Sequence, residues 1–137
     1  MNETRSVCHS LHACPPSPLP SFLPNQGGTT GVDLWESTAP AFGKNGSYGD
    51  LTYGAAAVQR IENHARLQNG QPLYLNLALQ VDHDPQEAPQ RFQDLFKGIY
   101  PKRAMFNAMS AVLDEAVGNV TAALKKVNMW DDTLLVG

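Results

Sequence analysis

Residues 73–79 read LYLNLAL, a short apolar run that is broken only by Asn76. A run of this length, ended by polar residues and Pro85, is typical of a strand that is buried on both faces of a parallel sheet. A second apolar run, at residues 133–136 (TLLV), predicts the start of another buried strand. These two runs make an α/β protein the first expectation.

Helical periodicity surrounds the two runs. Residues 50–66 are predicted to form a helix with Asp50 as its N-cap and with one apolar face made of Leu51, Ala55, Val58, Ile61 and Ala65. A short helix is expected around residues 86–96. The clearest helix is predicted at residues 102–127, where apolar side chains recur every three or four positions at Met105, Met109, Val112, Leu113, Ala116, Val120, Leu124 and Val127.

The order helix, strand, helices, strand predicts a crossover unit of a parallel or mixed sheet with flanking helices. Two or three helices cannot bury two parallel strands on both faces. The sequence therefore predicts that neighbouring elements of the sheet are missing from this chain.

Composition excludes some function classes. The chain has 137 residues, of which 42% are hydrophobic and 17% charged, and its formal net charge is -3. Its ten Lys and Arg residues form no basic stripe, so we expect no nucleic-acid partner. Because no apolar run approaches the roughly 20 residues that cross a bilayer, we expect no membrane partner either. The oligomeric state is left open.

The N-terminal part differs from the rest. Residues 1–30 are rich in Pro and Ser and are expected to be an irregular, disordered segment, whereas residues 31–137 are predicted to form a partial domain. Residues 1–24 contain one basic residue, Arg5, and several prolines, so they do not resemble a signal peptide. Cys8, His9, His12 and Cys14 have a spacing that would suit zinc, but the prolines that follow favour a tail.

His83 is the leading candidate for a functional residue. It follows the end of the first predicted strand, and ligands of open parallel sheets bind outside the carboxyl ends of the strands. The alternative is that its imidazole only ties down the loop against Asp82 or Asp84. A joint metal site of these three residues is disfavoured because successive side chains of an extended segment point in alternating directions.

Other polar residues receive structural interpretations. Asp131 and Asp132 are expected to form a turn, and Asp114 and Glu115 are expected on the solvated face of the long helix. Three asparagines match the N-glycosylation sequon, namely Asn2, Asn45 and Asn119. These sequons matter only if the chain enters the secretory pathway.

Two sequence blocks resemble the arylsulfatase B-like branch of the type I sulfatases. Residues 109–124 (MSAVLDEAVGNVTAAL) are similar to the family's D-E-A-V-G-N-V-T helix. Residues 72–80 (PLYLNLALQ), followed by His83, Pro85 and Pro89, resemble the family's P-L-F-L-Y-L-A-x-Q-x-x-H-x-P-x-x-x-P. The resemblance extends over about residues 31–136 and covers roughly three-quarters of the chain.

This resemblance implies an alkaline-phosphatase-like α/β fold and the hydrolysis of sulfate esters. In the family a cysteine that has matured to formylglycine attacks sulfur, while calcium holds the sulfate. The histidine that matches His83 contacts the sulfate and helps to protonate the leaving oxygen, both of which an imidazole can do near neutral pH. The family also implies a secreted or lysosomal glycoprotein, although this chain shows no signal peptide.

The chain departs from the family at the other catalytic positions. The paired N-terminal aspartates, the G-K-W-H segment and the D-N-G-G segment have no counterpart. Residues 14–17 (CPPS) match the start of the formylglycine signature C-x-P-S-R, but Pro18 replaces the arginine. We therefore expect a sulfatase fragment that has His83 as its catalytic residue, binds no calcium and is inactive alone. The alternative is a non-catalytic α/β interaction module derived from the sulfatase fold.

Overall fold

The computed structural model describes residues 34–44, 46–67, 70–83 and 86–137, which belong to two compact units, Met1–Gly49 and Asp50–Gly137. The first unit contains β1 (Trp35–Glu36) and β2 (Ala39–Pro40), which pair in antiparallel fashion with Trp35 opposite Pro40. The first residue of the two-residue turn between them, Ser37, has a φ of 59°. A positive φ at this position is what so short a hairpin loop requires.

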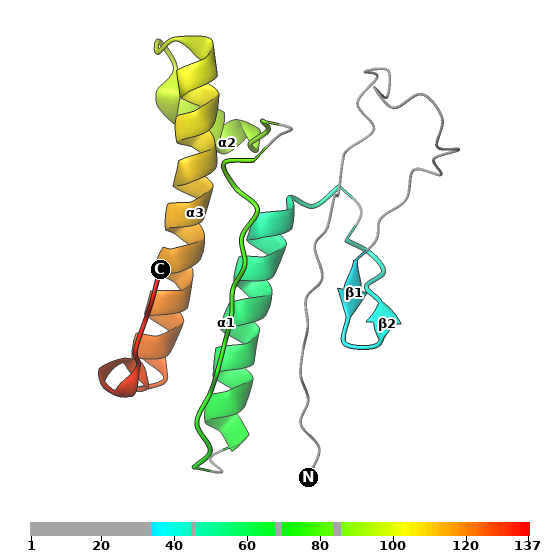
Figure 1. The fold of residues 1–137 in the computed structure, drawn as a ribbon, viewed down its shortest axis with the longest axis vertical. Coiled ribbons are helices and arrows are strands. Elements are labelled where there is room, and N and C mark those ends of the chain that lie inside the picture. Colours follow the sequence, from blue (N-terminus) through cyan, green and yellow to red (C-terminus); the bar gives the residue numbers. More distant parts are fainter. Residues whose placement is uncertain (1–33, 45, 68–69, 84–85) are drawn as a thin grey trace. The chain divides into compact units, whose positions relative to one another are not determined.

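The second unit is built on two long helices, α1 (Gly49–Leu67) and α3 (Pro101–Lys126), which lie side by side (Figure 1). A Cβ atom placed on Gly54 would lie 3.3 Å from Ala116 Cβ, and Lys126 Nζ lies 2.9 Å from Glu62 Oε1. Contacts therefore advance in the same direction along both helices, so the pair is parallel. After α1 ends, the chain runs back along this helix through residues 70–81, which are extended (Figure 1).

Both long helices bury a face with helical spacing, as the sequence predicted. The bounds are close to the predicted ones, and the buried positions of α3 include Met109, Val112, Ala116, Val120 and Leu124. The predicted face of α1 is wrong in part, because Ala55 is exposed and Ile61 alone of the five predicted residues is fully buried. The observed face consists of Asp50, Tyr53, Gly54, Ala57 and Ile61. Small residues on this face let α3 approach closely, and this approach decides which side of α1 turns inward.

A C-terminal cap of the Schellman type ends α3. Asn128 takes a φ of 58°, its N–H donates to Lys125 O at 3.1 Å, and the N–H of Met129 donates to Leu124 O at 2.9 Å. Met129 also packs against the core cluster to which Leu124 belongs. The chain then makes a 3-10 turn, η2 (Trp130–Asp132), where the sequence predicted a turn.

A short helical segment crosses beside the first half of α3. It consists of α2 (Gln90–Gln93) and the 3-10 helix η1 (Asp94–Phe96), and it is shorter than the predicted helix at 86–96. Pro89 has φ -57° and ψ 144°, which is an extended conformation, so the helix starts only after it. Phe92 is buried, and Arg91 forms a bidentate ion pair with Glu115 at 2.6 and 2.7 Å, so α2 is held to α3.

The two predicted strands are the main disagreement between sequence and structure. Residues 73–79 and 133–136 are extended, but neither belongs to a sheet within the described part of the chain. Leu73 and Leu77 pack on the core, whereas the side chain of Tyr74 is 91% exposed and that of Leu134 is 89% exposed. Burial on both faces was therefore a wrong prediction, because no neighbouring strand or second helical layer covers these segments among the described residues.

The described residues thus form a mixed α/β structure with three α-helices and a two-stranded sheet. The two-stranded sheet lies in the N-terminal unit and was not predicted. None of the helices in the described ranges is both long enough and apolar enough to cross a bilayer.

Candidate functional site

His83 lies in the bend that follows the extended segment, as the sequence predicted for a residue just past an apolar run. The backbone reverses at Asp82, which has a φ of 68°. This left-handed conformation is tolerated by Asp better than by most residues other than Gly and Asn. The side chains of Asp82 and His83 are both exposed. His83 thus lies at the surface of the described part of the chain.

The bend is attached to α1 through Asp50. The backbone N–H of Gln80 donates to Asp50 Oδ1 at 2.5 Å, and the backbone N–H of Val81 also hydrogen-bonds to this carboxylate. Asp50 is 4% exposed. Desolvation raises the pKa of Asp50, and the hydrogen bonds from Gln80, from its own backbone and from Val81 partly oppose that rise. The sequence predicted Asp50 as the N-cap of the helix, but α1 begins at Gly49 and Asp50 lies within its first turn. No sequence pattern indicated the contact of Asp50 with Gln80.

A weaker contact joins the bend to α3. The hydroxyl of Ser110 lies 3.4 Å from Asp82 Oδ1 and 3.2 Å from Phe106 O. The bend that carries His83 is thus placed between the first turn of α1 and the middle of α3. Residues far apart in the sequence meet here, which periodicity alone could not have indicated.

The other predicted residues do not gather around His83. Asp114 is exposed on α3, Asp131 and Asp132 are exposed in η2, and Glu115 pairs with Arg91. Asn119 is exposed on α3. Several predicted residues lie outside the described residues, namely Asn2, Cys8, His9, His12, Cys14, the CPPS stretch at 14–17, Asn45 and Asp84.

Metal-ligating side chains are not clustered in the described part of the chain. No group of three or more His, Cys, Asp or Glu residues there is placed to hold a metal ion. The buried carboxylate of Asp50 accepts hydrogen bonds from backbone N–H groups. Such donors suit a hydrogen-bond acceptor, whereas a cation would need further oxygen ligands. The described residues therefore do not fit the calcium that the family resemblance implies.

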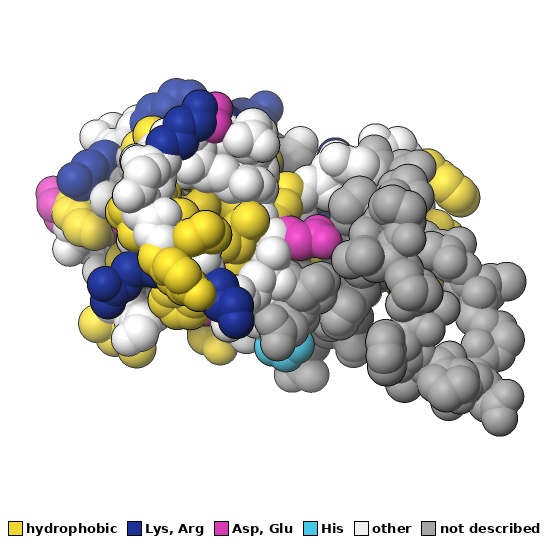
Figure 2. Space-filling view, turned by 90° about the horizontal axis from the view of Figure 1, so that it is seen from above, with side chains coloured by type: hydrophobic (Ala, Val, Ile, Leu, Met, Phe, Trp, Pro, Cys, Tyr) yellow, Lys and Arg dark blue, Asp and Glu magenta, His cyan; other side chains and the backbone are white. Residues whose placement is uncertain are grey.

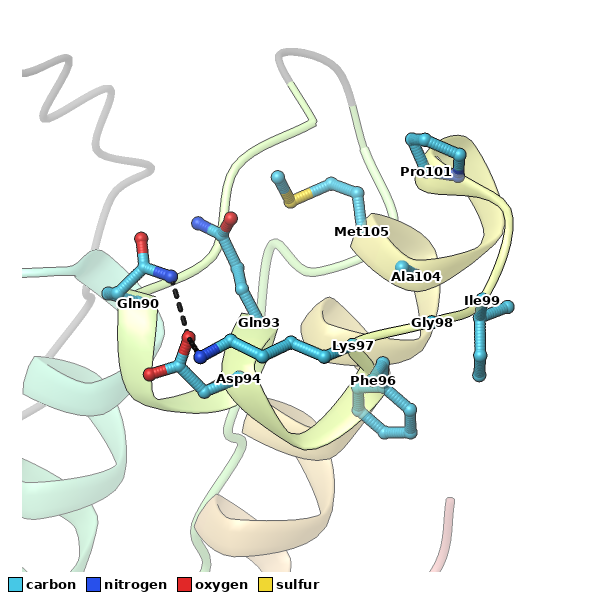
Figure 3. A pocket seen from close by; sticks show the side chains of 10 residues that line it. All are labelled: Gln90, Gln93, Asp94, Phe96, Lys97, Gly98, Ile99, Pro101, Ala104 and Met105. Carbon is cyan, nitrogen blue, oxygen red and sulfur yellow. Dashed lines mark hydrogen bonds and ion pairs between the residues drawn. The ribbon is translucent and has the colours of Figure 1, made fainter.

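A shallow hollow of about 310 Å³ lies between α2, η1 and the start of α3 (Figure 3). On one side Gln90 Nε2 donates to Asp94 Oδ1 at 2.8 Å, and Lys97 Nζ lies 3.0 Å from the same oxygen. Met105 and the first turn of α3 form the other side (Figure 3). Gln93, which also lines the hollow, donates from Nε2 to Ala88 O at 2.6 Å, and His83 does not line it.

Hydrophobic side chains are also exposed at this end of the second unit, where Lys and Arg side chains border them (Figure 2). The exposed large hydrophobic residues from the end of η1 to the start of α3 are Leu95, Ile99, Tyr100 and Phe106. These residues belong to η1, to the loop after it and to the first turns of α3, so they share no period that would mark them in the sequence.

The fold resembles that of one solved structure, described as Ps i-CgsB in complex with k-i-k-neocarrahexaose. The likeness covers 76% of this chain and 22% of that chain, with a TM-score of 0.63 and 25% sequence identity. The shared part is thus most of this chain and a small part of the larger protein.

In sequence, the chain is similar to arylsulfatase J of Mus musculus, with 32% identity over 111 residues. The match covers 80% of this chain and 18% of arylsulfatase J. No family model matches the chain. The resemblance to sulfatases that the sequence motifs indicated is therefore confirmed: this chain carries a sulfatase-type segment, which spans less than a fifth of the length of that relative.

Proposed function

We propose that this chain provides the sulfate-contacting histidine, His83, of an arylsulfatase-type sulfuric ester hydrolase with an alkaline-phosphatase-like fold. The observation that supports this proposal is the 32% identity to arylsulfatase J over 80% of the chain. The exposed position of His83 after the extended segment agrees with it. We further propose that the chain does not hydrolyse sulfate esters by itself.

The chemical role of His83 follows from the imidazole. A ring N–H can donate a hydrogen bond to a sulfate oxygen, and the same proton can pass to the leaving oxygen as the sulfur–oxygen bond breaks. Calcium in sulfatases would supply positive charge to the sulfate. We propose that this chain binds no calcium, and we assign it no metal-dependent step.

A chimera tests the role of His83. The matching 111-residue stretch of mouse arylsulfatase J would be replaced by the corresponding part of this chain, and hydrolysis of 4-nitrophenyl sulfate would be measured. We expect the chimera to be active and His83→Ala to lower kcat by roughly a hundredfold or more, the range of a lost general acid. The matched control is His64→Ala, because His64 lies near the other end of α1, where its Nε2 is 2.9 Å from Gln71 O.

The isolated chain provides the second arm of this test. We expect it to leave 4-nitrophenyl sulfate unhydrolysed with or without added calcium. Turnover that disappears in His83→Ala would refute the proposed inactivity and would support a complete catalytic site in this chain. An active chimera that is indifferent to His83→Ala would refute the role of His83.

A non-catalytic interaction module is the second candidate function. The exposed side chains of Tyr74, Leu134 and Val136 favour it, because exposed apolar side chains on extended segments are typical of surfaces that bind another chain. This candidate predicts a cooperative thermal transition for the isolated chain. A broad, non-cooperative transition would count against it.

Asn119 is proposed as a glycosylation site for a chain that enters the secretory pathway. It is exposed on α3, and no backbone unfolding is needed to reach its side chain. Expression with a signal sequence in mammalian cells, followed by glycosidase treatment, would show a mass loss that is smaller by one glycan in Asn119→Gln, because Asn2 and Asn45 also match the sequon.

A further inference from the structure

Asp50 has surroundings that the helix it belongs to does not explain. It is the one charged residue classed as buried within the described ranges, at 4% exposure. Burying a carboxylate is unfavourable unless hydrogen bonds replace the lost water. At Asp50 one such hydrogen bond comes from its own backbone, and two come from outside α1, from the backbone N–H groups of Gln80 and Val81.

We propose that Asp50 is a positioning residue that fixes the bend at residues 80–83 and thereby the place of His83. The contact with Gln80 spans 30 positions of the sequence and measures 2.5 Å between Asp50 Oδ1 and the Gln80 nitrogen. Gln80 and Val81 directly precede Asp82 and His83. Fixing these two backbone groups therefore leaves few free dihedral angles between the anchor and the imidazole.

Helix capping alone does not account for this arrangement. Ser, Thr and Asn start a helix about as well as Asp, and their side chains need to reach only the first turn. Asp50 instead uses its carboxylate on a segment that returns from the far end of α1. The negative charge strengthens hydrogen bonds from N–H donors, which suits a carboxylate that must hold a chain segment.

A second contact, between Asp82 and Ser110, also holds the bend at residues 80–83 in place. Ser110 on α3 lies 3.4 Å from Asp82, so the residue before His83 is placed against the other long helix. The left-handed backbone at Asp82 turns the chain between these two contacts. A loop that is held on both sides loses less conformational entropy when a ligand binds to it.

Amide hydrogen exchange of the full chain, followed by NMR, tests the proposal. Asp50→Ser keeps a residue that starts helices but cannot reach Gln80, and Asp50→Asn keeps an oxygen acceptor without the charge. We expect exchange at Gln80 and Val81 to become roughly tenfold faster or more in the Ser variant, which is the effect of losing a hydrogen bond to a charged group. The Asn variant should lie between the Ser variant and the native chain.

The NMR signals of the His83 imidazole provide a second measurement. They should not change if Asp50 only stabilised α1. We expect the side-chain NMR signals of His83 to shift toward those of an unstructured peptide in Asp50→Ser, while the helical amides of Ala57 and Ile61 stay protected. The matched control is Asp114→Ser, because Asp114 is an exposed carboxylate on α3. It should leave the His83 signals unchanged.

Two outcomes would overturn the proposal. One is native protection at Gln80 and Val81 in both variants, and the other is a loss of protection that is equally large at Ala57 and Ile61. If the Ser variant does not fold, the comparison of Asp50→Asn with the native chain decides by the same two criteria.

The inference deepens the proposed function, since it matters for catalysis only if His83 contacts the sulfate ester. The two can fail separately. An active chimera that is indifferent to His83→Ala would refute the catalytic role of His83 and leave the exchange results standing, whereas unchanged exchange would refute the role of Asp50 even if the chimera depends on His83.

Discussion

The paired helices and the extended segments of the second unit are both apolar in sequence, yet they differ in burial. The faces of α1 and α3 meet, and Ile61 is 1% exposed. The segments at 70–81 and 133–137 include Tyr74, which is 91% exposed, and Leu134, which is 89% exposed. An apolar run therefore predicts that a segment is suited to burial, but not that this chain buries it.

Backbone hydrogen bonding explains why the two regions differ. A helix satisfies its own N–H and C=O groups and needs only one apolar partner face. An extended segment needs neighbours along both edges as well as a cover on each face. One helical layer supplies a single face, and Leu73 and Leu77 use it by packing on the core cluster.

The sharpest test of this comparison pairs one substitution in each region. Ile61→Ala should lower the free energy of unfolding by about 2–5 kcal/mol, because it leaves a cavity in the core between α1 and α3. Leu134→Ala should change it by less than about 0.5 kcal/mol, because the side chain is already in water. Urea unfolding followed by circular dichroism measures both. Similar losses would show that residues 133–136 are buried in solution and would break the comparison.

A second test addresses the close approach of the two helices. Gly54→Val should cost about 1–3 kcal/mol, because a Cβ at this position already meets Ala116 Cβ at 3.3 Å and two further methyl groups would push the helices apart. Gly118→Val is the matched control, since no atom lies within 4 Å of a Cβ placed there. A destabilised control with an unaffected Gly54 variant would mean that α1 and α3 do not meet at this point.

A third test uses the solvent side of the helix pair. Gly118→Ala should raise the free energy of unfolding by about 0.5–1 kcal/mol, because alanine loses less backbone entropy in a helix and its methyl group meets nothing. The midpoint of thermal unfolding would rise by a few degrees. A decrease would indicate that this face of α3 is covered.

The smallest expected effect is the pH dependence of the ion pair between α2 and α3. The hydrogen bond and charge of Arg91 lower the pKa of Glu115 below its usual value of 4.5. Because the folded-state pKa is lowered, the pair stabilises the fold above the unfolded-state value and loses this contribution as the pH falls through the folded-state value. The effect is modest, because both side chains are partly exposed.

Glu115→Gln checks this sign. The native chain should be more stable than the variant at pH 7, and the difference should shrink steadily below about pH 4.5. Guanidinium would screen the pair, so urea is the suitable denaturant. A difference that grows as the pH falls would contradict the assignment.

The sequence predicted the helices well and the packing of the extended segments poorly. Helical spacing depends on one chain segment, so α1 and α3 were found with bounds close to those observed. The predicted buried face of α1 was wrong in part, because the close approach of α3 at Gly54 decides which side of the helix turns inward, and hydrophobic spacing does not mark a glycine. Burial of residues 73–79 depends on neighbours that no local pattern contains.

Local sequence patterns predicted the position of His83 but not the tertiary contacts that support it. The position of His83 after an apolar run could be read directly from the sequence, and the sulfatase resemblance implied a role that stays a prediction. The support from Asp50 and Ser110 could not be read, since these contacts join residues 30 and 28 positions apart through the tertiary fold.

The parallel arrangement of α1 and α3 has a consequence for the speed of folding. Two antiparallel helices joined by a short turn form their contacts early, because the partners are near in the chain. Here Glu62 and Lys126, which form an ion pair, are 64 positions apart in the sequence. The segment at residues 70–81 must also fold back along α1 before α3 can pack against it. Folding rates fall as the mean sequence separation of contacts rises. A predominantly helical unit with this connectivity should therefore fold at the pace of mixed α/β proteins, well behind that of simple helical bundles.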